Sequence, residues 1–210
     1  MSAAPAHPAA AATPPLQARA WLYVLLSNGH EDLLKVGLTC DPLARWSAFH
    51  PRWYDAFDLS HSMLVACESR RDAQRLETAL HRLLADQRCP MPLTMRTTAA
   101  GASEWYRGAY PRTRRFAEDC AAHGHPVHWD ARAVLAPAML AQAERLHGLM
   151  LEAHRGLLDG WLQPGQCHAM VDLVEGHCRF DPALAAGLPQ PAWQELQRAS
   201  LQHRGPGIAA

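Results

Sequence analysis

The chain has 210 residues, of which 49% are hydrophobic and 19% charged, and its formal net charge is +0. This length supports one sizeable core plus an additional segment. No apolar run approaches the roughly 20 residues of a membrane-spanning helix, and the six cysteines are spaced too widely for a disulfide framework. We therefore expect a cytoplasmic protein with no membrane partner.

The charges are distributed unevenly along the chain. Residues 19–115 contain 14 Lys and Arg residues and 10 Asp and Glu residues, whereas residues 116–210 contain 6 and 10. The first region is thus +4 and the second −4. Such a division indicates an anionic partner for the basic region, although scatter among solvated side chains explains a difference of this size about equally well.

The composition divides the chain into three parts. Residues 1–18 are mostly Ala and Pro, with neither the basic start nor the apolar centre of a signal peptide, so we expect a disordered tail. Residues 19–123 predict an α/β (α+β) domain with a small, mostly antiparallel, three-stranded sheet flanked by helices. Residues 131–202 predict a helical C-terminal domain that packs on the first domain, on a protein partner or on another copy of the chain.

A β-hairpin opens the α/β domain. Residues 21–26 have strand composition and are followed by Asn-Gly, a strong hairpin turn signal, and residues 33–37 form a second short apolar strand. If Tyr23 pairs with Gly37, then Tyr23 and Lys35 lie on the same face of the sheet. A slip of one residue would place them on opposite faces.

Further elements follow in the order helix, strand and helix. Asp41 and Pro42 cap a helix over 41–50 that carries Arg45 near its N-terminal end. A third strand covers 62–67, and the Ser-Arg-Arg-Asp sequence at 69–72 is a capping box that opens a second helix. Apolar residues at helical spacing predict further helices over 111–123, 131–158, 168–175 and 191–200.

Together, the hairpin, an arginine and a glutamate resemble the GIY-YIG nuclease superfamily. The triplet ending at Tyr23 corresponds to the first family triplet, Lys35-Val36-Gly37 to the second, and Arg45 and Glu77 to the family's helical arginine and glutamate. The Lys-Val-Gly form, a Leu-Glu-x-x-Leu-His run and a Glu-Trp-Tyr triplet at 104–106 are similar to the phage-type DNA-binding or meiotically up-regulated branch. Lysine replaces the family's second tyrosine, and its late asparagine has no counterpart.

The resemblance implies a metal-dependent DNA endonuclease with Tyr23, Lys35, Arg45 and Glu77 as its catalytic residues. Arg45 offers a planar fork for a phosphate, and Glu77 is sufficient to hold one Mg²⁺ (or Mn²⁺). Tyr23 would act on the attacking water, and since free tyrosine has a pKa of about 10, it needs a nearby cation, for which Lys35 is the candidate. We expect contacts to DNA from Arg52, Trp53, Arg70, Arg71 and His81.

Alternatives remain at this stage. The missing asparagine favours a DNA-binding module on the same scaffold that does not cleave, whereas the retained Tyr23, Arg45 and Glu77 favour a nuclease. Glu77 and His81, four residues apart on one helix, also suit an ordinary surface pair. Cysteines and histidines between 120 and 178 are zinc-ligand types, but their spacing fits no compact zinc finger.

Overall fold

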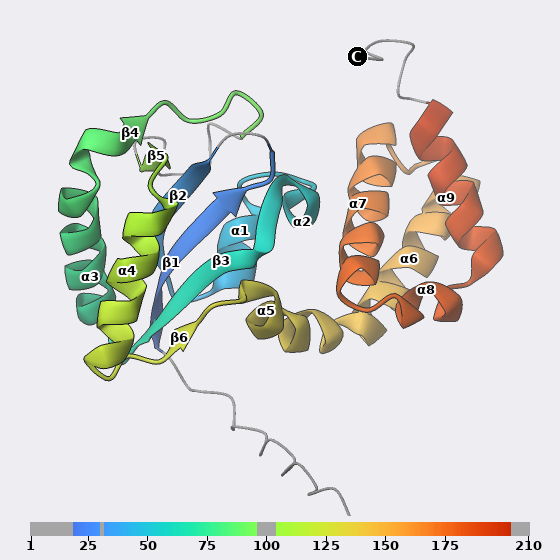
Figure 1. The fold of residues 1–210 in the computed structure, drawn as a ribbon. Coiled ribbons are helices and arrows are strands. Elements are labelled where there is room, and N and C mark those ends of the chain that lie inside the picture. The colour runs from blue at the N-terminus through green and yellow to red at the C-terminus, as the bar shows by residue number, and fades with distance from the viewer. Residues whose placement is uncertain (1–18, 30–31, 96–103, 203–210) are drawn as a thin grey trace, which may run out of the picture.

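A six-stranded antiparallel sheet forms the centre of the first part of the chain (Figure 1). The structure is a computed structural model that describes residues 19–29, 32–95 and 104–202. Its strands are β1 (Ala20–Ser27), β2 (Leu33–Thr39), β3 (Phe57–Cys67), β4 (Arg88–Cys89), β5 (Trp105–Arg107) and β6 (Val127–His128). Their order across the sheet is β4-β5-β2-β1-β3-β6.

The described residues also contain nine α-helices. They are α1 (Pro42–Ser47), α2 (Trp53–Ala56), α3 (Arg70–Leu83), α4 (Tyr110–Ala122), α5 (Ala131–Leu140), α6 (Ala143–Leu158), α7 (Pro164–Phe180), α8 (Ala183–Gly187) and α9 (Gln190–Gln202), and a short 3₁₀ helix covers Ala85–Gln87. In this part of the chain, no helix combines the length and apolarity needed to cross a membrane.

The α+β class is confirmed, but the predicted number of three strands is wrong. The three expected strands are β1, β2 and β3, and the three further ones are short. Two of these, β4 and β6, have only two residues each, which is too few for an alternating pattern to be visible in the sequence. The expected tail over 1–18 lies outside the described residues.

The alternation of side chains along β1 builds two cores, one on each face of the sheet. Tyr23 and Leu25 pack with α1, α2 and α5, whereas Leu22 and Val24 pack with α3 and α4 (Figure 1). The register pairs Tyr23 with Gly37, which is the register that we considered above. Tyr23 and Lys35 therefore lie on the same face.

A third core lies among the C-terminal helices. Its buried residues come mainly from α6, α7 and α9 and include Met150, Val174 and Leu196. The predicted helix over 131–158 is in fact two helices separated at residues 141 and 142. The buried residues of α5 belong to the core on the sheet, so the division between the cores falls after this helix rather than before it.

Helix α7 packs on α2 and joins the C-terminal helices to the first domain. Arg52 forms ion pairs with Asp55 at 2.8 Å in its own segment, and with Asp172 at 3.0 Å and Glu175 at 2.5 Å on α7. Next to these pairs, Gly176 lies against the ring of Tyr54. The C-terminal helices thus pack on the first domain, which is one of the expected arrangements.

Gly176 provides a test of this junction. A Cβ atom added there would lie 2.9 Å from Cδ1 of the buried Tyr54 ring, so Gly176→Ala forces the two elements apart. We expect a loss of about 1–3 kcal/mol in the free energy of unfolding, measured by urea denaturation. Gly148→Ala in α6 is the matched control, because an added Cβ meets nothing within 4 Å, and it should gain about 0.5–1 kcal/mol. Equal stability of the two variants would contradict the close contact between Gly176 and Tyr54.

Candidate functional site

A groove of about 690 Å³ lies at the uncovered part of β2, between α1 and α3. Strand β5 pairs with β2 only over residues 33–35, and the carbonyl of Glu104 accepts a hydrogen bond from the backbone N–H of Val36. Beyond these residues, no described strand pairs with this edge of β2, and its residues 37–39 line the groove. Three predicted catalytic residues also line it, Tyr23 from β1, Arg45 from α1 and Glu77 from α3.

Gly37 allows the Tyr23 side chain to reach the groove. The two residues are directly opposite in the β1–β2 pair, and a Cβ atom on Gly37 would lie only 2.6 Å from Cζ of Tyr23. The phenol ring therefore occupies the space that any side chain at position 37 would need. This close approach is a physical reason for glycine at the end of the Lys-Val-Gly triplet.

The hydroxyl of Tyr23 is protonated at neutral pH. Burial raises the pKa of Tyr23 to about 12, and the cation that opposes this rise is Arg45. Lys35, which we expected to lower this pKa, lies on the same face but is directed at a carboxylate instead. The expected activation of Tyr23 by Lys35 is thus corrected, because the loss of water around the phenol outweighs the nearby charges.

Lys35 forms a buried ion pair with Glu104. Its side chain has no exposed surface, and Nζ lies 3.0 Å from Oε2 of Glu104. The amine also lies 5.3 Å from the ring centre of Phe49 and 5.7 Å from that of Trp105, a cation–π arrangement. Burial lowers the pKa of Lys35, and Glu104 opposes this shift. Glu104 immediately precedes β5. Because Trp105 of β5 pairs with Lys35 of β2, the Glu104 carboxylate lies within reach of the amine.

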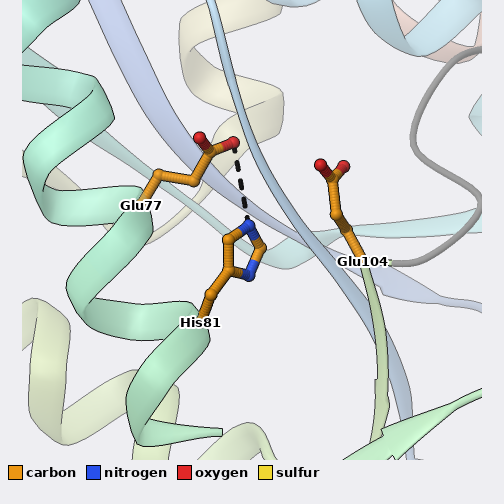
Figure 2. A group of neighbouring side chains, drawn as sticks. All are labelled: Glu77, His81 and Glu104. Atoms are coloured by element: carbon orange, nitrogen blue, oxygen red, sulfur yellow. Dashed lines mark ion pairs between the residues drawn. The ribbon is translucent and has the colours of Figure 1, made fainter. Parts of the chain in front are cut away.

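Glu104, His81 and Glu77 form a group with the character of a metal site. One ligand atom from each of the three lies within 4.8 Å of the others, and Figure 2 shows their side chains converging from α3 and from the start of β5. Burial and the neighbouring Glu104 raise the pKa of Glu77, while burial lowers that of His81. A carboxylate pair and a neutral imidazole are ligands for a divalent cation.

Hydrogen bonds hold this group in place. The side chain of Ser69 caps α3, which carries Glu77 and His81 four residues apart on one face. Nδ1 of His81 lies 2.6 Å from the hydroxyl of Tyr106, and its Nε2 lies 3.9 Å from Oε1 of Glu77. The tyrosine thus orients the imidazole as an outer partner of a metal ligand does.

The other predicted DNA contacts occupy different environments. Arg70 and Arg71 are exposed at the start of α3, and Arg70 lines the groove. Arg52 is held by carboxylates at the junction, and Trp53 is only 6% exposed and packs 5.6 Å from the ring of Phe180. We therefore remove Arg52 and Trp53 from the expected DNA contacts, because carboxylates pair with Arg52 and packing against α7 covers Trp53.

Glu104 is a residue of this group that was not among the site residues predicted from the sequence. The signal was present in the Glu-Trp-Tyr triplet, but the contact with Lys35 depends on the pairing of β5 with β2. His81, expected as a DNA contact, lies instead in the same group. Within the described ranges this is the only cluster of three such ligands, so the cysteines and histidines between 120 and 178 form no comparable zinc site there.

The Lys35–Glu104 pair gives an asymmetric prediction for stability. Glu104→Gln removes the charge that compensates a fully buried amine and should lower the free energy of unfolding by about 2–4 kcal/mol. Lys35→Met should cost about 1 kcal/mol, because it keeps the apolar stem and leaves Glu104, which is 32% exposed, open to water. Urea denaturation at pH 7 measures both. A larger loss for Lys35→Met than for Glu104→Gln would rule out this account of the pair.

Comparison with known proteins finds a similarity within the first domain. Residues 20–121, which include β1 to β5, α1 to α3 and most of α4, match the family model of the T5orf172 domain. This match corrects the expected assignment to the GIY-YIG superfamily, which is a different family. No curated protein and no solved structure matches the chain. The T5orf172 domain is a nuclease-like and DNA-binding domain, so the similarity supports a function related to DNA.

Proposed function

We propose that this protein is a metal-dependent endonuclease that hydrolyses phosphodiester bonds in DNA. The observation that carries the proposal is the convergence of Tyr23, Arg45 and Glu77 on one groove, from three separate elements. Hydrolysis of a phosphodiester requires a positioned water, a cation beside the phosphate oxygens and help for the leaving oxygen. The groove contains candidates for the first two of these requirements.

Arg45 is proposed to bind the phosphate at the bond that is cleaved. It is partly exposed at the mouth of the groove, and its guanidinium lies 4.8 Å from the ring centre of Phe49. The ring supports one face of the guanidinium, and its N–H groups can donate to two phosphate oxygens at once. Arginine also keeps its charge at every relevant pH, so the site stays positive as negative charge develops.

Glu77, His81 and Glu104 are proposed to hold a divalent cation, Mg²⁺ or Mn²⁺. When bound, such a cation polarises the phosphate and lowers the pKa of a coordinated water. The donor set fits because it contains two carboxylates, and the imidazole favours Mn²⁺ over Mg²⁺. Lys35 is then a positioning residue, because its ion pair holds the Glu104 carboxylate beside the other two ligands.

Tyr23 is proposed to orient the attacking water rather than to remove its proton. With a pKa of about 12, the phenol keeps its proton at neutral pH and can act as both a donor and an acceptor of hydrogen bonds. Gly37 leaves free the space that the ring occupies against β2. This role requires the hydroxyl only for positioning, and such placement accounts for a large part of the barrier reduction in many enzymes.

Glu77→Ala tests the proposal. Without this carboxylate the cation is held weakly, so cleavage of supercoiled plasmid and branched DNA with Mg²⁺ or Mn²⁺ should fall on the order of 10²-fold or more. Glu118→Ala, at an exposed glutamate of α4, is the control and should cleave like the wild-type protein. EDTA should abolish the wild-type activity.

The alternative is a DNA-binding module without cleavage. The high pKa of Tyr23 and the absence of a second asparagine beside Asn28 favour it. A wild-type protein that binds DNA but leaves every substrate intact with both metals would establish this alternative and refute the endonuclease.

His81 gives a second test, of the cation itself. Because nitrogen ligands favour Mn²⁺, His81→Gln should lower the affinity for Mn²⁺ about tenfold or more and the affinity for Mg²⁺ by less. Isothermal titration calorimetry without DNA measures both affinities. His154→Gln is the control, since this histidine pairs with Glu195 among the C-terminal helices. Equal changes for the two metals would argue against ligation through His81.

A further inference from the structure

The outward face of α3 carries a stripe of polar side chains, namely Arg71, Arg75, Thr78 and Arg82. Successive residues of a helix are about 100° apart, so these four lie within a sector of about 60°. The three arginines are exposed. Over eleven residues the stripe runs about 16 Å along the helix.

The stripe is continuous with the proposed active site. A second hollow, of about 590 Å³, is lined by the whole stripe together with Arg70 and Gln74. Arg70 and Gln74 also line the groove that contains Glu77, and the side-chain amide of Gln74 donates a 2.7 Å hydrogen bond to Oε2 of Glu77. A ligand that leaves the groove past these two residues therefore arrives at the stripe.

Most of the positive charge on this face is not neutralised by the protein. Arg75 pairs with Asp72. For Arg70, Arg71 and Arg82, the described part of the chain provides no acidic partner. Arginines that are exposed and lack carboxylate partners have donors available for a polyanion.

We propose that this stripe binds the sugar–phosphate backbone of the DNA strand that enters the groove. The inference rests on the proposed function for its substrate, and adds the path that the strand takes. A length of about 16 Å corresponds to the rise of roughly five nucleotides of one strand. Because the stripe contains arginines and a hydroxyl but no aromatic side chain, it contacts phosphates and does not stack on bases. The binding is therefore independent of sequence.

The double substitution Arg71→Gln and Arg82→Gln tests the path by binding alone. It is made in the Glu77→Gln background, so that DNA stays intact, and compared with Arg145→Gln and Arg155→Gln, which remove two exposed arginines from α6. Fluorescence anisotropy with two unrelated 30-base-pair duplexes is measured over a KCl series. The stripe variant should bind about tenfold or more weakly on both sequences, with a salt slope smaller by about two. A slope equal to that of the α6 control would overturn the proposal.

Cleavage by proteins that retain Glu77 separates the two proposals. If DNA is cleaved, the stripe variant should raise KM at least tenfold, with the larger share of the loss in KM rather than kcat. Cleavage with an unchanged KM would refute the proposed path along the stripe but not the proposed endonuclease activity. DNA binding that depends on the stripe, without any cleavage, would refute the proposed endonuclease activity but not the proposed binding of DNA by the stripe.

Discussion

The pairing of Tyr23 with Gly37 is the constraint on which the site depends. In an antiparallel pair, directly opposite residues share a face, and a slip of one residue would move every side chain of a strand to the other face. The observed register places Tyr23 and Lys35 on the face of α1, and leaves the even-numbered residues of β1 for the core under α3 and α4. The phenol then lies over Gly37 and reaches the edge of the sheet.

The groove combines an acidic centre with a basic margin. Burial raises the pKa of Glu77, and the nearby Glu104 raises it further. Such a pair is stabilised by positive charge, which Lys35 supplies from beneath and which a divalent cation would supply from the groove. Arg45 and Arg70 line the same groove and suit the phosphates of a substrate.

Contacts with the C-terminal helices occupy the basic and aromatic residues Arg52 and Trp53. Arg52 and Trp53 have the composition of a nucleic-acid surface, yet α7 brings Asp172 and Glu175 to the arginine and covers the tryptophan. Three carboxylates around one guanidinium satisfy most of its donors, so its charge is used within the chain. The exposed arginines of α3, next to the groove, remain open to an anionic partner.

Local signals in the sequence determined the central elements of the first domain. The strand composition of 21–26 and the Asn-Gly that follows it specified the hairpin, and the caps at Asp41 and Ser69 specified the starts of α1 and α3. These signals act over a few residues and can be read without the fold. They were enough to place Tyr23, Arg45 and Glu77 on the elements that carry them.

Only the tertiary structure decided which side chains meet. The ion pair between Lys35 and Glu104 joins residues 69 positions apart, and it exists because β5 pairs with the edge of β2. The two-residue strands β4 and β6, the division of the cores after α5 and the covering of Trp53 also depend on contacts between distant segments. Burial, which only the folded chain defines, sets the pKa of Tyr23 and the environment of Lys35, and therefore their chemistry.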